Sequence, residues 1–181
     1  RKGYGGGHHA LAAAQIPIPT TNGNGITKKS IDAMVRGLTK RFLKATGDAK
    51  YFDYLNRVYW AVTDLLYDEE YHLFYRDTKY LDAKTPAGRK VFWSRGNGWV
   101  LGGLPRILQF LPTENECYQR YVQLLQTMAT EIALRQQADG LWRANLDDPA
   151  QFPNPETSGT AFFCYAMAWG VNNGLLDKEK Y

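Results

Sequence analysis

A short stretch of the chain concentrates side chains that could bind a charged sugar. Residues 92–99 read FWSRGNGW and supply the indoles of Trp93 and Trp99, the guanidinium of Arg95 and the carboxamide of Asn97. Indole faces stack on sugar rings, and a guanidinium binds a carboxylate through two parallel hydrogen bonds. The carboxamide could position a hydroxyl group or a water molecule. The stretch therefore indicates an acidic-sugar site, and the alternative is two core tryptophans with a capping arginine.

The element that must position this stretch is an apolar helix. Gly96 and Gly98 allow a tight bend, so we expect a loop that leads into a helix over residues 98–111. Pro105 predicts a kink or a late helix start, and Pro112 predicts the helix end. A helix N-terminus carries unpaired N–H groups and partial positive charge, which suits an anionic ligand. The residues at helical spacing are Val100, Leu101, Leu104, Ile107, Leu108 and Leu111.

The composition indicates one globular domain. The chain has 181 residues with 44% hydrophobic and 22% charged content, enough to bury a real core. Aromatic content is 14%, which is typical of a carbohydrate or nucleotide cleft but also of simple core filling. The net charge of +4 comes without a Lys/Arg block, so it suits an acidic substrate and does not indicate nucleic acid.

Several classes of site are not indicated. No apolar run approaches the roughly 20 residues that a membrane span needs, so we expect no membrane partner. Cys117 and Cys164 lie far apart without metal-ligand spacing, so neither a disulfide framework nor a zinc site is predicted. His8 and His9 are adjacent and point in different directions. With no metal cluster and no phosphate-binding loop, we expect neither a metal nor a cofactor.

The chain divides into an arm and a helical domain. Residues 1–30 are rich in glycine, proline and turn residues, which predicts an irregular or flexible N-terminal arm. The domain then spans 31–181. The chain begins with Arg1, and its end resembles the start of a further helix. Both ends are therefore expected to have been cut from something longer.

Within the domain, helix pairs alternate with long loops. Apolar spacing predicts helices over residues 31–46, 48–66, 116–137 and 161–172, besides the helix over 98–111. Short extended pieces are expected after the first and second helix pairs. The order repeats, because Leu73 to Leu141 is 68 positions and Ser94 to Ser158 is 64. A unit of this kind, with the long loops at one end, predicts an all-α toroid of which this chain supplies only part.

Four segments carry a resemblance to a known family. FWSRGNGWV, LPRILQFLP, DGLWRANLDDP and PETSGTAFFCYAMAWGVNNGLLD resemble glycoside hydrolase family 105, the unsaturated rhamnogalacturonyl hydrolases, over about residues 31–177. The resemblance implies an (α/α)6 barrel, of which the chain is about half. It also implies removal of 4,5-unsaturated galacturonic acid from the non-reducing end of rhamnogalacturonan fragments of pectin.

The resemblance implies a single carboxylic acid as catalyst. It protonates the double bond, water adds, and the resulting hemiketal falls apart, so the two-carboxylate scheme of ordinary glycosidases is not required. Asp32 falls at the matching place and is the candidate acid. The family usually has aromatics before this residue, whereas Lys28–Ser30 precede it here. The alternative is that Asp32 only complements the dipole at a helix start.

The resemblance also implies the substrate contacts. Trp93, Arg95 and Trp99 match the family's tryptophan–arginine–tryptophan spacing, with Arg95 on the uronate carboxylate and the indoles walling the sugar. Many members carry a histidine where this chain has Arg76, so Arg76, Asp77 or the nearby His72 could take over its hydrogen bond. A solvated Arg76–Asp77 pair is the alternative. Glu156 and Ser158 fall in the equivalent loop of the next repeat, where a capping role for Thr157 or Ser158 is the alternative.

Two rival functions stay open. The related family 88, the unsaturated glucuronyl hydrolases, shares the barrel and the chemistry but acts on glycosaminoglycan fragments. A non-catalytic or degenerate carbohydrate-binding toroid is the rival from another class. The resemblance implies a bacterial protein of the cytoplasm or the periplasm with an acidic oligosaccharide as partner. The sequence leaves the oligomeric state open.

Overall fold

The computed structural model describes residues 49–181. The predicted arm over 1–30, the predicted helix over 31–46 and the candidate acid Asp32 lie outside the described residues. Their predictions therefore stay predictions.

The described part of the chain is mainly helical. A two-stranded antiparallel hairpin follows the first helix and pairs Tyr67 with Phe74 and Asp68 with Leu73. Two 3-10 turns interrupt the long loops. The elements are α2 (Ala49–Leu66), β1 (Tyr67–Asp68), β2 (Leu73–Phe74), η1 (Thr78–Tyr80), α3 (Ser94–Leu108), α4 (Tyr118–Ala133), η2 (Pro149–Gln151) and α5 (Thr157–Asn172).

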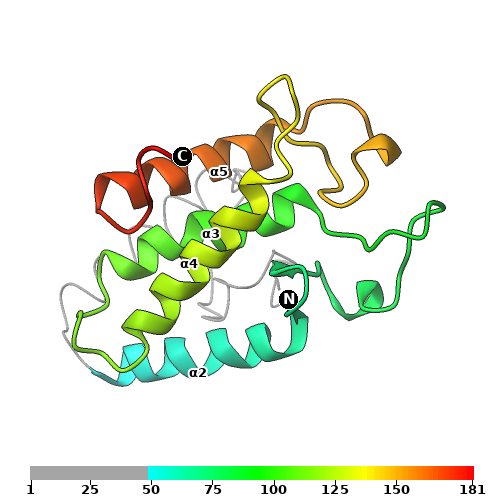
Figure 1. The fold of residues 1–181 in the computed structure, drawn as a ribbon. Helices are drawn as coiled ribbons and strands as arrows, with labels where there is room; N and C mark the ends of the chain where they lie inside the picture. Colours follow the sequence, from blue (N-terminus) through cyan, green and yellow to red (C-terminus); the bar gives the residue numbers. More distant parts are fainter. Residues whose placement is uncertain (1–48) are drawn as a thin grey trace, which may run out of the picture.

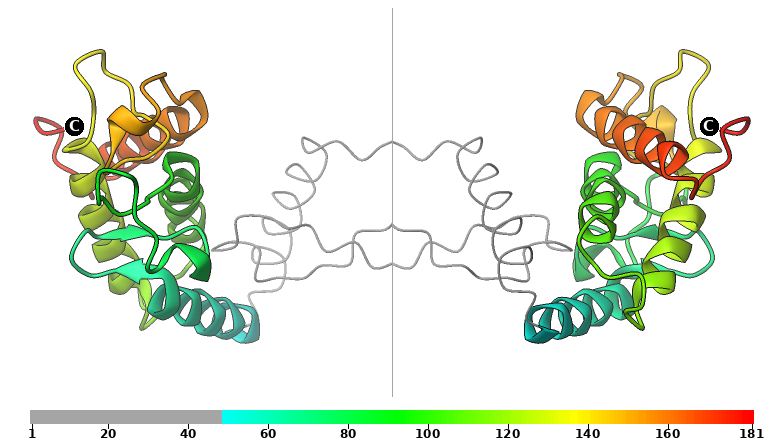
Figure 2. Two further views of the ribbon diagram at one scale, coloured as in Figure 1. Left: turned by 90° about the vertical axis from the view of Figure 1, so that its right-hand side faces the viewer. Right: turned by 90° about the vertical axis from the view of Figure 1, so that its left-hand side faces the viewer.

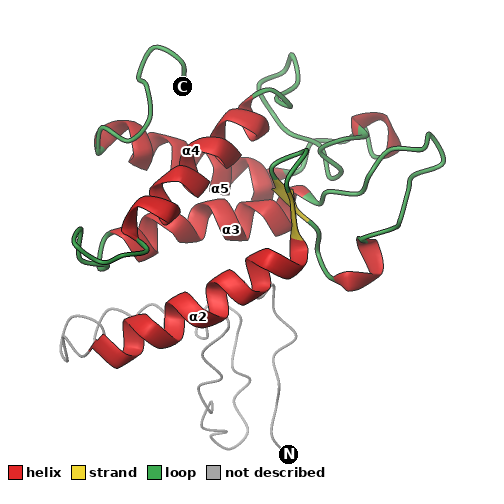
Figure 3. Cartoon of the chain, turned by 60° about the horizontal axis from the view of Figure 1, so that its bottom comes forward, coloured by secondary structure: helices red, strands yellow, loops and turns green. Residues whose placement is uncertain are grey.

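The helices stack with α2 and α5 at opposite sides and α3 and α4 between them (Figures 1 and 2). The closest helix pair is α3 with α5. Both long loops, residues 75–93 and 134–156, lie at the same end of this stack, on the right-hand side of Figures 1 and 3. The starts of α3 and α5 and the small hairpin face the same end. This arrangement agrees with the expectation that the long loops gather at one end.

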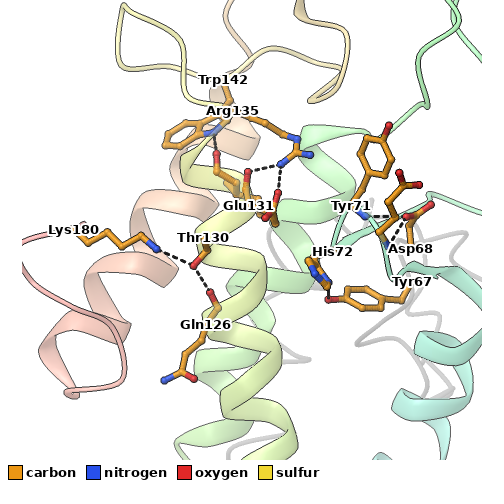
Figure 4. A network of polar contacts seen from close by, with 12 residues as sticks. Tyr67, Asp68, Tyr71, His72, Gln126, Thr130, Glu131, Arg135, Trp142 and Lys180 are labelled. Carbon is orange, nitrogen blue, oxygen red and sulfur yellow. Dashed lines mark hydrogen bonds and ion pairs between the residues drawn. The ribbon is translucent and has the colours of Figure 1, made fainter.

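One apolar core joins the helices. Tyr59 and Tyr121 stack edge to face at 4.9 Å and connect α2 to α4, while the Tyr121 hydroxyl donates to Asn56 Oδ1 at 3.1 Å. Trp142 closes the loop end of α4, because its Nε1 donates to the carbonyl of Ile132 at 2.6 Å (Figure 4). The fully buried apolar side chains of the core include Leu101, Leu104, Leu125, Met128, Ile132 and Phe163.

The predicted helices are present among the described residues, but two of them begin earlier than expected. The α2 helix confirms the predicted second helix, and α4 lies inside the predicted 116–137. The α3 helix begins at Ser94 rather than at Gly98, and it continues through Pro105. The prediction of a loop through Gly98 is therefore wrong. The α5 helix begins at Thr157, four residues before the expected Ala161.

Close helix packing explains the glycines that suggested a loop. A Cβ atom at Gly98 would lie 3.1 Å from Phe162 Cβ and 3.3 Å from Gly159 Cα. Glycine at this position therefore lets α3 and α5 approach one another inside regular helix. Sequence spacing alone does not separate this use of glycine from a bend. Among residues 49–181, none of the helices combines the length and apolar character that a bilayer crossing needs.

Candidate functional site

The starts of α3 and α5 bring three of the predicted site residues together. Arg95 Nε donates to Ser158 Oγ at 2.9 Å, and Arg95 Nη2 lies 3.5 Å from Glu156 Oε1. The two helix starts can meet because a Cβ at Gly159 would lie 2.8 Å from Ser94 Cβ, so only glycine fits there. The Arg95 side chain keeps 57% of its surface exposed. It is thus held from one side and open on the other.

Glu156 caps α5, so the alternative of a capping role for Thr157 or Ser158 is wrong. Its carboxylate accepts the backbone N–H groups of Ser158 and Gly159, and the Ser158 hydroxyl donates to Oε1 at 2.5 Å. Burial acts to raise the pKa of Glu156, but these hydrogen bonds and the charge of Arg95 outweigh it and hold the pKa below its usual value. Glu156 is therefore a carboxylate at neutral pH and orients Arg95 through Ser158.

The two indoles contact different parts of the molecule. Trp93, the residue before α3, lies between Phe152 at 5.6 Å and Tyr80 at 6.1 Å between ring centroids. Trp99, in the second turn, packs on Phe162 of α5 at 4.5 Å. In a helix Trp99 follows Arg95 by about one turn and lies on the same side, toward α5. Trp99 thus contributes to the helix interface. The expectation that the two indoles wall a sugar stays a prediction.

Asn97 is a structural residue, which corrects the hypothesis that it positions a hydroxyl group or water. Its side chain is 0% exposed. Its Oδ1 accepts the Phe74 N–H at 2.8 Å, and its Nδ2 donates to the carbonyls of Phe74 at 3.0 Å and Trp93 at 3.2 Å. The carboxamide thus satisfies the backbone N–H and C=O of Phe74 in β2, and it ties β2 to the start of α3.

The three candidates near the hairpin separate into two places. His72 lies in the hairpin turn with φ 52°, and its Nδ1 is 3.0 Å from the Tyr67 hydroxyl (Figure 4). Arg76 Nε lies 3.0 Å from Asp77 Oδ2, and its guanidinium lies 5.1 Å from the Tyr80 ring centre. Asp77 also caps η1 by accepting the Lys79 N–H at 3.0 Å. Arg76 and Asp77 thus pair with one another at the surface, beside Tyr80.

An ionic cluster that the sequence analysis missed links the two ends of the loop over 75–93. Asp68 Oδ2 accepts from the Tyr75 hydroxyl at 2.6 Å and from Lys90 Nζ at 2.7 Å. Burial acts to raise the pKa of Asp68, and its hydrogen bonds with Lys90 and Tyr75 hold it below its usual value. Burial and the Asp68 carboxylate raise the pKa of Tyr75 to about 12. These residues are separated in sequence and share no recognisable spacing, so no pattern could have grouped them.

Further charged groups surround this cluster at the hairpin end. Lys90 lies over the Tyr71 ring at 4.4 Å. Arg135, which follows α4, pairs through Nη1 with Oε2 of Glu131 in α4 at 2.8 Å (Figure 4). Within residues 49–181, no group of three or more His, Cys, Asp or Glu side chains is arranged to hold a metal ion. The carboxylates described above, Asp68, Asp77, Glu131 and Glu156, form ion pairs or caps.

The described helices thus form a stack with Arg95 and its polar partners at the loop end. Comparison with known proteins shows the family. The profile of Glycosyl Hydrolase Family 88 matches residues 32–181, a range that includes Asp32. The chain therefore belongs to this family of glycoside hydrolases.

Individual relatives agree with this placement. The unsaturated 3S-rhamnoglycuronyl hydrolase of Alteromonas sp. (strain LOR) is 44% identical over 137 residues, which are 76% of this chain and 33% of that protein. A solved family 88 glycosyl hydrolase from Bacteroides vulgatus is 41% identical with a TM-score of 0.78, covering 82% of this chain and 43% of that one. The chain thus spans only a third to about two fifths of these proteins.

The similarity extends to family 105. A solved structure from Salmonella enterica, described as a possible member of the GH105 family, is 26% identical with a TM-score of 0.66. It covers 81% of this chain and 38% of the other. The expected family 105 resemblance is thus found in structure, while the matched profile carries the name of family 88, the predicted alternative. The family 88 and family 105 matches agree on the fold and on the glycoside hydrolase class.

Proposed function

We propose that the complete product of the gene encoding this chain removes a 4,5-unsaturated uronic acid from the non-reducing end of an oligosaccharide. The observation that carries the proposal is the half-exposed guanidinium of Arg95 at the loop end of α3. Ser158 and Glu156 hold it from one side. Because the guanidinium is already oriented, less side-chain entropy is lost when it binds a uronate carboxylate. The family and the name of the Alteromonas relative support the same substrate class.

The proposed reaction needs one proton donor. The donor protonates the double bond of the unsaturated uronate, water adds to the adjacent carbon, and the hemiketal that forms opens and releases the remaining sugar. Glu156 and Asp68 are poor donors, because the pKa of each is held below its usual value. This supports Asp32, the first residue of the family match, as the acid. We propose that burial keeps Asp32 protonated near neutral pH.

We further propose that the described helices form part of an (α/α)6 ring with the long loops around its mouth. The starts of α3 and α5, which lie at the same end as the two long loops, support this arrangement (Figure 3). For the sugar, the relative's name favours a uronate attached to rhamnose. That linkage agrees with the expected rhamnogalacturonan fragments, but it does not require galacturonic acid. Family 88-like glucuronyl substrates are the competing possibility.

The test measures loss of the ultraviolet absorbance of the unsaturated uronate when the complete gene product is added to lyase-treated polysaccharides. We expect loss with rhamnose-linked uronates. Asp32→Asn should abolish the loss, and Arg95→Gln should lower kcat/KM by about a hundredfold, because a charge-assisted pair is removed. Arg57→Gln, an exposed arginine on α2, is the matched control and should leave the rate unchanged.

Other outcomes would redirect the proposal. Unchanged activity in Asp32→Asn would remove that residue from its role, and unchanged activity in Arg95→Gln would refute the proposed carboxylate contact. Faster loss with glycosaminoglycan fragments would favour the glucuronyl alternative. Binding of the oligosaccharides without any loss of absorbance would favour the carbohydrate-binding toroid.

A further inference from the structure

We propose that Tyr80, Trp93 and Phe152 form an aromatic platform for the sugar that follows the uronate, with Arg76 binding an anionic substituent on that sugar. The inference rests on the proposed function, since it assigns the neighbour of the cleaved residue. The platform residues come from the two long loops, and the rings of Tyr80 and Phe152 both contact Trp93. Phe152 and Tyr80 were not among the predicted site residues.

The geometry of the rings supports a platform. Phe152 is tilted by 38° from Trp93 at 5.6 Å, whereas Tyr80 meets Trp93 edge-on at 86° and 6.1 Å. The Trp93 indole nitrogen is buried without a hydrogen-bond partner among the described residues, so Trp93 contributes to the platform by packing against the other two rings. Phe152 keeps 43% of its surface exposed although it is large and apolar. A pyranose presents apolar C–H faces that pack on such rings.

The platform is fixed in place before any ligand arrives. Asn145 is 0% exposed and its Oδ1 accepts the Phe92 N–H at 3.2 Å, while its Nδ2 donates to Gln151 Oε1 at 3.0 Å. The Leu146 N–H donates to the Phe92 carbonyl at 2.9 Å. These bonds join the loop before α3 to the loop that carries Phe152. A preformed surface avoids part of the ordering cost of binding.

Arg76 gives the platform a charged edge. Its guanidinium lies 5.1 Å from the Tyr80 ring centre, and the side chain is 47% exposed. Asp77 engages Nε at 3.0 Å, and among the described residues neither terminal nitrogen of Arg76 has a hydrogen-bond or ion-pair partner. An arginine stacked on an aromatic ring with free terminal nitrogens suits a sulfate ester or a carboxylate. A neutral sugar would use the rings alone.

The experiment compares substrates that differ only after the uronate, using the complete gene product. One substrate is the methyl glycoside of the unsaturated uronate, and the others attach it to a neutral, a sulfated or a carboxylate-bearing sugar. Phe152→Ala should lower kcat/KM by about 3- to 10-fold on the disaccharides and leave the methyl glycoside unchanged. Phe152→Tyr should restore the rate. Tyr165→Ala, at 44% exposure on α5, is the control of equal exposure.

Arg76→Gln tests the charged edge separately. It should lower kcat/KM about tenfold on the anionic disaccharides, and the larger loss identifies whether sulfate or carboxylate is preferred. The neutral disaccharide should change less than about twofold. Equal losses on the methyl glycoside and the disaccharides would overturn the platform assignment. Equal losses on neutral and anionic sugars would overturn the role of Arg76. If the unmodified protein cleaves none of the substrates, the proposed function itself fails.

Discussion

The starts of α3 and α5 lie against one another, but only the start of α5 has a side-chain cap for its backbone N–H groups. The α5 start has its own anion, because the Glu156 carboxylate accepts two backbone N–H groups there. The α3 start is preceded by Trp93, and no side chain from the described residues caps it. Where α5 carries its acceptor Glu156, α3 carries the cation Arg95 on its second residue. The two helix starts therefore carry side chains of opposite charge, although Arg95 and Glu156 are not equivalent in the repeat, because Arg95 aligns with Gly159.

The difference assigns a structural role to Glu156 and a ligand-binding role to Arg95. Glu156 satisfies α5 and, through Ser158, also fixes the direction of Arg95. The Arg95 guanidinium keeps an open side, so it can meet an external carboxylate. The simple view that a helix start is an anion site thus applies poorly to α5, whose site is occupied internally. The predictions below test this division of roles, from the largest expected effect to the smallest.

Asn97, whose carboxamide joins β2 to the start of α3, should be the position where a single substitution lowers stability most. Asn97→Ala leaves the N–H and C=O of Phe74 buried without their partners, which should lower the free energy of unfolding by about 4 kcal/mol. Urea unfolding monitored by tryptophan fluorescence measures the loss. Asn154→Ala, in the exposed loop before α5, should change stability by less than about 0.5 kcal/mol. A loss of unfolding free energy below about 1 kcal/mol for Asn97→Ala would contradict this role of Asn97.

The close approach of the two starts is tested by a pair of glycine substitutions. Gly159→Ala would place Cβ 2.9 Å from the Ser94 carbonyl carbon, so backbone must move, and stability should fall by about 3 kcal/mol. Gly96→Ala meets only Trp93 Cβ at 3.7 Å, and it should raise stability by up to about 1 kcal/mol through helix propensity. Thermal melts of both variants decide the matter. Equal effects would mean that the helix starts are not in contact.

Sequence reasoning gave the helical order, the repeat and the loop end, because these depend on apolar periodicity and chain order. It grouped Arg95, Glu156 and Ser158 through the repeat and the family resemblance. It misassigned Asn97 and Gly98. The local sequence alone does not distinguish an amide or glycine in a ligand pocket from one in a helix contact. The Asp68–Tyr75–Lys90 cluster and Phe152 could not be found, since their partners are set by loop geometry rather than by spacing.

The charge of the α5 cap gives a pH-dependent prediction. Glu156→Gln keeps the shape but removes the charge from the two backbone N–H bonds, which should cost about 1 kcal/mol of stability at pH 7. The pKa of folded Glu156 lies below its ordinary value of 4.5, so the stabilisation is present above that value. It is lost as the pH falls through the lowered pKa.

Urea unfolding from pH 7 to pH 3 should therefore show the difference between the original chain and Glu156→Gln narrowing in acid. Glu116→Gln, an exposed glutamate before α4, is the control and should show little difference at any pH. A gap that widens in acid would reverse the sign and would mean that the folded state prefers protonated Glu156.

The smallest effect concerns the ion pair that joins the two starts. A double-mutant cycle of Arg95→Gln and Glu156→Gln should give a coupling below about 0.5 kcal/mol in unfolding free energy, because the pair is exposed on the Arg95 side and its atoms are 3.5 Å apart. Arg95→Gln alone should barely change stability while it lowers substrate turnover. A coupling above about 1.5 kcal/mol would show that the guanidinium is committed to Glu156. Arg95 would then serve the fold in the way that Glu156 does, and the two helix starts would no longer differ in role.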